Sequence, residues 1–426
     1  MSSQAEAYIE MADAPVRNAG KWVLMASLGV TFFVLLTLFV AILGVLLPNQ
    51  IENINPATKT ATLGIIFAIT SVFSTTIIPV TGSFSDRTRS RLGRRTPWIV
   101  FGGVAGGLST VLIPYGGNIV GITAFWLLAT LTLNSMQPAL TAVVADRFLP
   151  SERGMVSGVV GACMTAGVSA GTIFGGLMAA HMFQAYAIIG IGIMIACLLF
   201  VLINPEPPLS HLGPPEPFKL GAFLRGFWIS PREHPDFAWA FFGRFSIYMG
   251  YQAILTYLLY ILEDYIGLEQ AVANTTIARM SSVTFVALVC SGLLAGWLAD
   301  RTGRLKPLVF VAGLLIACAE IAPLVSPNLR GMFGYAVLIG LGYGSFMSVD
   351  LALMTHVLPP RPAGEDTTGR DLGILTTAIN VPQILSPVMA AGLLSATGNN
   401  YPLLFCVAAA FVVAGAGFVL PIRSVR

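Results

Sequence analysis

Two stretches of the chain, one in each half, carry the same short pattern of residues. Gly82-Ser-Phe-Ser-Asp86-Arg87-Thr88 returns as Gly296-Trp-Leu-Ala-Asp300-Arg301-Thr302. Shortly after each, Gly93-Arg94-Arg95-Thr96-Pro97 is matched by Gly303-Arg304-Leu305-Lys306-Pro307. A pattern that recurs once per half indicates a chain built from two related halves, with each pattern at the same place in its half.

The sequence around both patterns is mostly apolar. Of the 426 residues, 55% are hydrophobic and 10% are charged, whereas a soluble domain carries roughly 25% charged residues. The apolar residues form uncharged blocks such as 30–47, 99–112 and 407–420. Roughly twelve blocks can be counted, each about long enough for a spanning helix of about 20 residues. Because the blocks are continuous and do not alternate, we predict an all-α polytopic membrane protein.

The predicted helices fall into two bundles joined by a proline-rich linker. We expect a cytoplasmic segment at 1–21, an N-terminal bundle at 22–203, the linker at 204–236, a C-terminal bundle at 237–421 and a tail at 422–426. The linker's density of proline excludes a helix there. The expected helices are 22–48, 60–82, 97–115, 120–144, 155–180, 185–203, 237–262, 275–298, 307–325, 332–356, 372–396 and 402–421.

The basic residues predict the orientation. If the N-terminus faces the cytoplasm, most of the 23 lysines and arginines lie in cytoplasmic segments. The opposite loops then hold only Lys59 and Arg330. Cytoplasmic loops carry such an excess because translocation of Lys and Arg is disfavoured. We therefore predict an integral protein of the cell (plasma or inner) membrane with both termini in the cytoplasm, no cleaved signal, and lipids around it.

The paired loop motifs resemble the signature of the major facilitator superfamily over essentially the whole chain. The longer form at 85–99, and the stretches 137–146, 369–373 and 381–387, are similar to a branch that contains sucrose transporters and glycoside–pentoside–hexuronide cation symporters. This resemblance implies twelve helices in two six-helix bundles around a central cavity, and transport by alternating access.

One difference from the plant sucrose transporters concerns proton coupling. Their fourth helix carries an Asp and an Arg at positions that hold Thr130 and Thr141 in this chain. Their coupling site therefore cannot be carried over, and a bacterial relative with another substrate is implied.

The loop motif is the expected gate. Glycine lets helices approach closely, Asp86 can face a helix N-terminus or a neighbouring arginine, and the arginines can bind lipid phosphates, Asp146 or Glu152. The resemblance implies a latch on the cytoplasmic side in the outward-facing state, whereas the alternative is that the arginines only set topology. The gating residues are Gly82, Asp86, Arg87, Gly93, Arg94, Arg95, Gly296, Asp300, Arg301, Gly303 and Arg304.

Charged residues inside helices are confined to the second half. Arg244 and Asp350 lie at a matching depth of about 12 Å from the cytoplasmic side, at about 1.5 Å per residue. We expect them to pair, with Asp350 as the proton-coupling group and Arg244 as its partner. Arg279 and Glu320 match in the same way near the outer face. The alternatives are structural ion pairs or snorkelling to the interface.

Uncharged polar residues inside helices are candidates for substrate binding. Amides, a phenol and a guanidinium suit a hydroxyl-rich solute, and tyrosines can stack on a sugar ring. The alternative is that the amides join helices by hydrogen bonds. The candidates are Asn134, Gln137, Arg244, Tyr248, Gln252, Asn380 and Gln383.

Other chemistry is not indicated. There is no nucleotide-binding loop of the Gly-x-x-x-x-Gly-Lys-Ser/Thr type, and the five dispersed cysteines form no metal-ligand spacing. We predict no enzyme, cofactor, metal or nucleic acid. We expect a monomeric secondary active transporter that moves a small organic solute, a sugar or glycoside, with protons. The alternatives are export of an amphipathic or lipid-like compound, and a non-transporting assembly or receptor protein on the same scaffold.

Overall fold

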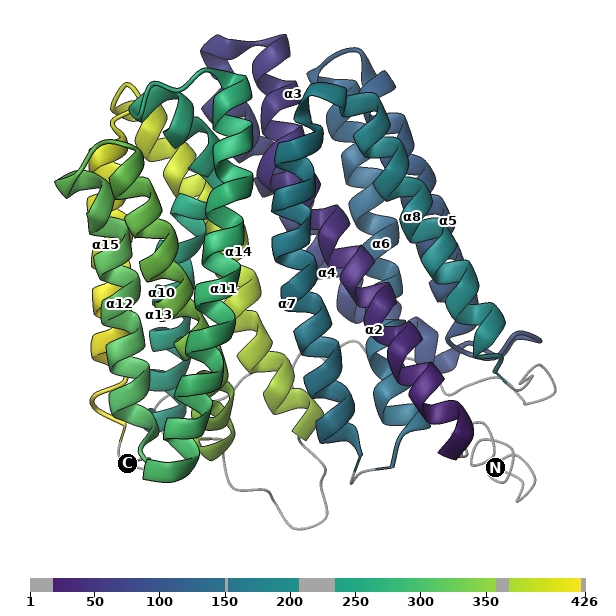
Figure 1. Cartoon of the computed structure of the whole chain (residues 1–426). Coiled ribbons are helices and arrows are strands. Elements are labelled where there is room, and N and C mark those ends of the chain that lie inside the picture. Colours follow the sequence, from purple (N-terminus) through teal and green to yellow (C-terminus); the bar gives the residue numbers. More distant parts are fainter. Residues whose placement is uncertain (1–17, 150–151, 207–233, 358–367, 423–426) are drawn as a thin grey trace. The chain divides into compact units, whose positions relative to one another are not determined.

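The computed structural model describes residues 18–149, 152–206, 234–357 and 368–422, and Figure 1 shows their helices. Eleven stretches of these residues are long and apolar enough to cross a membrane. One of them, Arg153–Ile203, contains two long helices joined by a short turn of 3-10 helix. The predicted all-α polytopic membrane fold is confirmed.

Among the described residues, the first half holds six long helices and several short helical turns. These elements are α2 (Asn18–Ala41), η1 (Ile42–Leu46), α3 (Leu47–Ile54), η2 (Pro56–Thr58), α4 (Lys59–Arg87), α5 (Thr96–Leu112), η3 (Ile113–Gly116), α6 (Ile119–Arg147), α7 (Arg153–Met178), η4 (Ala179–His181) and α8 (Met182–Ile203). The first predicted helix runs past its expected end at 48. Pro48 has no amide hydrogen to donate within a helix. The wider turn of the π-helix η1, which ends two residues before Pro48, lets the helix continue past it.

The second half also holds six long helices. They are α10 (Pro235–Tyr260), followed by the π-helix η5 (Ile261–Tyr265), α11 (Gln270–Thr302), α12 (Leu305–Val325), α13 (Leu329–His356), α14 (Thr368–Ala396) and α15 (Tyr401–Phe418). Most of the predicted linker, 207–233, lies outside the described residues, as do 1–17 and 423–426.

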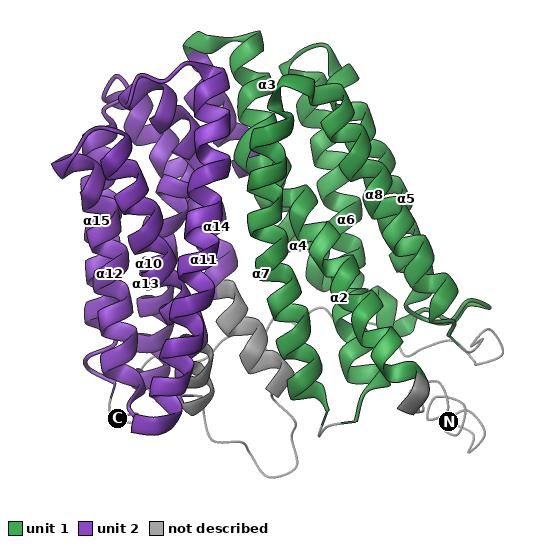
Figure 2. Cartoon of the chain, in the orientation of Figure 1, with its two compact units in different colours: residues 1–57, 69–217 green, residues 58–68, 218–426 purple. Residues whose placement is uncertain are grey.

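The chain divides into two compact units, coloured separately in Figure 2. The first unit comprises residues 1–57 and 69–217, and the second comprises 58–68 and 218–426. In the first unit, α5 packs against α6 and α8. Glycines permit this close approach, because a Cβ on Gly102 would lie 2.6 Å from the Thr132 carbonyl oxygen, and Gly107 meets Gly190 backbone to backbone.

The second unit includes the start of α4, which the sequence assigned to the N-terminal bundle. Three contacts explain this placement. Lys59 makes ion pairs with Glu263 and Asp264 of η5 at 3.2 and 2.8 Å. The Tyr257 hydroxyl lies 3.2 Å from the Thr60 carbonyl oxygen. Further along α4, Gly64 packs so tightly on α14 that a Cβ would collide with Ala391.

Candidate functional site

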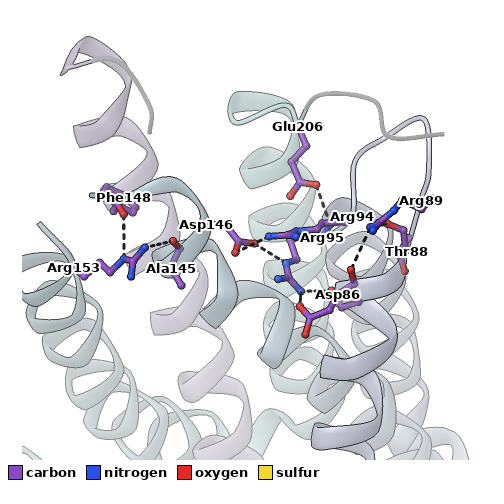
Figure 3. Close-up of polar contacts among 11 residues, drawn as sticks. Asp86, Thr88, Arg89, Arg94, Arg95, Ala145, Asp146, Phe148, Arg153 and Glu206 are labelled. Atoms are coloured by element: carbon purple, nitrogen blue, oxygen red, sulfur yellow. Dashed lines mark hydrogen bonds and ion pairs between the residues drawn. The ribbon is translucent and has the colours of Figure 1, made fainter. Parts of the chain in front are cut away.

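The first repeat loop is built around the buried side chain of Arg95, at the start of α5 (Figure 3). Its Nε donates to Asp146 at 2.8 Å, and its guanidinium also pairs with Asp86 and donates to Ser85 at 3.1 Å. Burial opposes the charge of Arg95, but Asp146 and Asp86 outweigh it and raise the pKa of Arg95 above its ordinary value. Arg94 adds a second ion pair to Asp146 at 2.8 Å. The loop thereby ties the ends of α4, α5 and α6 together.

A fourth element joins this network through Glu206, which follows α8. One carboxylate oxygen accepts a hydrogen bond from the Arg95 amide at 2.9 Å, and the Thr96 amide also donates to Glu206. The carboxylate therefore caps the N-terminus of α5, where the helix dipole favours a negative charge. Burial raises the pKa of Glu206. Gly93, with φ of 92°, lies directly against this carboxylate, so that a Cβ would overlap it.

Glu152, which the sequence offered as a partner of the loop arginines, pairs with another residue. Lys21 of α2 donates to it at 2.6 Å, and this hydrogen bond lowers the pKa of Glu152. Next to it, Arg153 donates to the carbonyl oxygens of Ala145 and Phe148 at 2.7 and 3.2 Å, which closes the end of α6 (Figure 3). The acidic partner of the loop arginines at this end of α6 is therefore Asp146.

The second repeat loop makes few such contacts. Asp300, Arg301 and Arg304 are exposed, and none makes an ion pair with any residue that the structure describes. The Arg301 guanidinium lies 5.2 Å from the Trp297 ring centroid. Lys306 instead donates to the Leu420 carbonyl oxygen at 2.9 Å and so closes the end of α15. The glycines differ too: a Cβ on Gly82 would meet Pro138 at 3.4 Å, whereas Gly296 faces open space among the described residues.

Inside the second unit, the structure brings Arg244 of α10 and Asp350 of α13 together. Their Nε and Oδ2 atoms are 2.9 Å apart, and both side chains are at least nine-tenths buried. Tyr248, one turn along α10, lies 3.3 Å from the Tyr343 hydroxyl, oxygen to oxygen. Tyr251 stacks on Tyr343 with ring centroids 4.4 Å apart. An ion pair and three phenols, of which Tyr248 is buried and Tyr251 and Tyr343 are half-buried, therefore form one polar cluster in the membrane-spanning part of this unit.

Sequence reasoning missed Tyr343, although a signal for it was present. It lies two helical turns before Asp350 on α13, a spacing that places both residues on one face of the helix. Gln252, which was expected here, continues the α10 face one turn beyond Tyr248 and donates to Thr256 at 3.3 Å.

The amide candidates on other helices lie in different surroundings. Asn134 of α6 is buried and donates to Ser74 of α4 at 3.0 Å, which is the helix-joining contact named as the alternative. Gln137, on the same helix, is half-buried. On α14, Asn380 is half-buried and Gln383 is exposed. The nearby Ser386 fixes α14 to α10 by donating to the Met249 carbonyl oxygen at 2.6 Å.

The expected outer pair of Arg279 and Glu320 is not found. Arg279 is exposed and Glu320 is fully buried, and no ion pair joins them in the described part of the chain. The prediction assumed that consecutive helices touch. Instead, α11 and α12 each pack extensively against α13 and scarcely against each other.

Comparisons with known proteins agree with this architecture. The sequence model of the Major Facilitator Superfamily matches residues 22–387 and 240–425. A di-/tripeptide transporter of Lactococcus lactis subsp. lactis is 30% identical over 175 residues, 40% of this chain and 33% of that relative. The chain thus aligns with about a third of that transporter's length. A cis,cis-muconate transport protein of Acinetobacter baylyi is 27% identical, over 61% of this chain and 63% of the relative.

One further relative and one solved structure widen the comparison. The fujikurins efflux protein of Gibberella fujikuroi is 26% identical, over 67% of this chain and 58% of the relative. The crystal structure of a bacterial homologue of the human lysosomal transporter Spinster, inward-facing and occupied, superposes with a TM-score of 0.70. It is 15% identical, over 95% of this chain and 97% of that one, and so is similar in fold.

Proposed function

The chain belongs to the major facilitator superfamily, and on that premise we propose that it moves a small hydroxylated organic solute, such as a sugar or glycoside, together with protons. The family and the fold are those of a secondary transporter rather than an enzyme. Within this family, the branch of sucrose transporters and glycoside–pentoside–hexuronide cation symporters is the proposed affiliation. The solute class, the protons and the site at Arg244 and Asp350 are proposed as well.

The observation that carries the proposal is the buried pair of Arg244 and Asp350. A charge inside the bilayer costs roughly 2.5–3.5 kcal/mol or more, so such residues mark ion or proton pathways. The Arg244 Nε and the Asp350 Oδ2 lie 2.9 Å apart, so each charged group has its counter-charge in contact. When a conformational change separates them, Asp350 is left without its counter-charge and takes up a proton instead. Separation of these two side chains would therefore bind one proton, and their pairing would release it, once per cycle.

The tyrosines and amide beside this pair support a solute rich in hydroxyl groups. Tyr248, Tyr343 and Gln252 offer hydroxyl and amide groups that both donate and accept hydrogen bonds. The stacked rings of Tyr251 and Tyr343 offer flat apolar surface of the kind that sugar rings pack against. Arg244 adds a charged donor within reach of the same face.

Export of an amphipathic compound is the second candidate, and two observations favour it. The membrane-spanning helices of the first half keep their charged residues near their ends, as with Asp86 in α4 and Asp146 in α6. In addition, a relative over two thirds of this chain is named as an efflux protein. A weakly polar wall in one half suits a solute with a large apolar part.

For the location we propose the cell membrane, with both termini in the cytoplasm and a functional monomer. The support is the basic residues, which crowd the helix ends that carry the two repeat loops. Phosphate groups of the lipids are natural partners for the exposed Arg301 and Arg304 of the second loop.

The test begins with purified protein and a panel of sugars, glycosides, organic acids, peptides and amphipathic drugs, each screened for thermal stabilisation. A ligand that binds the folded state raises its melting temperature, and the stabilisation grows with the logarithm of the ligand concentration above Kd. We expect sugars or glycosides to stabilise the protein, and Tyr248→Phe and Gln252→Ala to weaken that stabilisation. Asp300→Asn is the matched control, because its side chain is exposed. The proposed solute class is wrong if only amphipathic compounds bind, or if both variants keep wild-type affinity.

A further inference from the structure

Glu320 of α12 is an acid that the proposed mechanism does not use. Its residue is 0% exposed, and neither carboxyl oxygen has a hydrogen-bond partner among the residues that the structure describes. It lies six residues before Ser326, the residue that follows α12, and so about 9 Å along the helix from that end at about 1.5 Å per residue. An ionised carboxylate in such surroundings costs several kcal/mol unless a cation pairs with it. Glu320 has no such cation within the described chain.

The register of α12 on α13 shows what faces Glu320. A Cβ on Gly342 would lie 2.7 Å from Ile316, so these two residues mark the contact between the helices. Nearer the end of α12, a Cβ on Gly334 would lie 4.0 Å from the Ala322 Cβ, so Tyr335, the next residue of the antiparallel α13, lies close to the level of Glu320. Tyr335 is 3% exposed and interacts electrostatically with Glu320.

The other helices that pack on α12 present no cation to Glu320. The described part of α15 has two ionisable side chains, Tyr401 and Cys406. The first donates to Asp264 at 2.7 Å and the second is exposed. On α11, Arg279 is exposed and makes no ion pair with a described residue. From α10, Tyr251 interacts electrostatically with Tyr335.

Tyr335 begins a row of four tyrosines that ends at the ion pair: Tyr335 and Tyr248 are buried, and Tyr251 and Tyr343 are half-buried. It interacts electrostatically with Tyr251, whose ring stacks on Tyr343 at 4.4 Å between centroids. The Tyr343 and Tyr248 hydroxyl oxygens are 3.3 Å apart, and both phenols interact with Arg244 and Asp350. Glu320 thus interacts with the first tyrosine of this row, and the Arg244–Asp350 pair interacts with the last two, so the row connects the two acids electrostatically.

We propose that Glu320 is a second proton-binding site, and that its occupancy is linked electrostatically to the Arg244–Asp350 pair through the row of tyrosines. The carboxyl group binds one proton as a neutral acid and releases it to solvent when the unit rearranges. No other bond changes. Its part in coupling rests on the proposed function, but its protonation is a property of the resting protein.

Infrared spectroscopy of the full-length protein in lipid nanodiscs tests this without transport. Spectra recorded across a pH titration should contain a carbonyl stretch of a protonated carboxylic acid, and this band should shift on labelling with ¹³C-glutamate. Glu320→Gln should abolish the band, and Asp350→Asn should retain it. Glu320→Met gives the same readout if the Gln variant does not purify. An unchanged band in both Glu320 variants, or no shift on labelling, overturns the site.

The electrostatic link has its own readout. In Asp350→Asn and in Tyr335→Phe, the pH midpoint of the Glu320 band should move away from the wild-type midpoint. Thr275→Ala, an exposed change on α11, should leave the midpoint in place. A midpoint that is identical in all four proteins overturns the link. Loss of solute uptake in any variant bears on the proposed function and leaves the infrared result as it stands.

Discussion

In the first unit, the loop after α4 ties four helix ends together through Arg95 and Glu206, whereas the loop after α11 in the second unit leaves Asp300, Arg301 and Arg304 in solvent. The two loops share their glycine, their Asp-Arg pair and a left-handed glycine. The position of the buried arginine, however, holds Leu305 in the second copy. A repeated motif therefore predicts a similar backbone conformation in both loops. Its ion pairs, however, depend on whether the position of Arg95 holds an arginine and on the acidic residues around it.

Within the described membrane-spanning helices, it is the second unit, not the first, that contains buried charged side chains. The second unit holds the buried ion pair and Glu320, an acid with no partner among the described residues, and all three side chains lie within helices outside its repeat loop. The first unit keeps its ion pairs at helix ends, at Arg95 and at Lys21. The first unit thus has its ion pairs at the ends of its helices, while the proposed coupling pair lies inside the second unit.

Arg95→Ala should give the largest loss of stability. It removes a buried cation that holds Asp86 and Asp146, and breaking a buried pair costs roughly 3–5 kcal/mol. Arg304→Ala, the exposed counterpart in the second loop, should change stability by about 0.5 kcal/mol or less. Thermal unfolding of both variants in one detergent compares them. Equal losses would show that the two loops are equally structural.

Gly93→Ala and Gly303→Ala separate backbone strain from crowding. Both glycines have positive φ, 92° and 62°, which costs an alanine about 1 kcal/mol. Only at Gly93 would the added Cβ meet a neighbour, the Glu206 carboxylate, whereas nothing described lies within 4 Å of a Cβ at Gly303. The melting temperature should therefore fall further in Gly93→Ala. A larger fall in Gly303→Ala would contradict the role given to Glu206.

Glu206→Gln should change how stability depends on pH. Because burial raises the pKa of Glu206 above its ordinary 4.5, the folded state binds more protons than the unfolded state. The stabilisation from this group is then complete below pH 4.5 and is lost as pH rises through the raised pKa. Melting temperatures across this range should fall with pH more steeply in wild type than in Glu206→Gln. Parallel curves would mean that the carboxyl group ionises as freely as in solution.

Asp86→Asn should have the smallest effect on stability among the variants of the first loop. Its side chain is 61% exposed, so its ion pair with Arg95 is largely screened and is worth about 0–1 kcal/mol. Asp300→Asn, without an ion pair to any described residue, should be neutral. Chemical denaturation of the two variants side by side decides the matter. A loss in Asp86→Asn that approaches that of Arg95→Ala would show that Asp86, not Asp146, is the main partner.

Much of the fold could be predicted from sequence, because charge-free blocks of spanning length report helices directly. The pairing of Arg244 with Asp350 could also be predicted. Both residues lie at the same depth in their helices, and an unpaired charge inside the membrane is costly, so each has few possible partners. The extension through Pro48 was not predicted, because a π-helix depends on how one proline is accommodated. The Arg279–Glu320 pair was wrong because order along the chain does not say which helices touch.

Other contacts join residues far apart in sequence and have no local signal. Glu206 caps α5 from a position more than 100 residues away, and the start of α4 is held by Glu263 and Asp264 of η5. The tyrosines were only partly found. Tyr335, Tyr343 and Asp350 lie on one side of α13. Tyrosines that only fill the core have the same helical spacing, so the spacing alone does not identify functional ones.

The most direct test of the central claim compares two transport modes in liposomes that contain Asp350→Asn, with Thr275→Ala, an exposed change on α11, as the control. Exchange of labelled solute at equal pH needs binding and rearrangement only, whereas accumulation driven by a pH gradient also needs proton coupling. We predict that Asp350→Asn retains exchange and loses accumulation. If the unpaired arginine prevents folding, the double variant Asp350→Asn/Arg244→Gln removes both charges and should behave in the same way. Accumulation at the wild-type level in either protein would contradict coupling through Asp350.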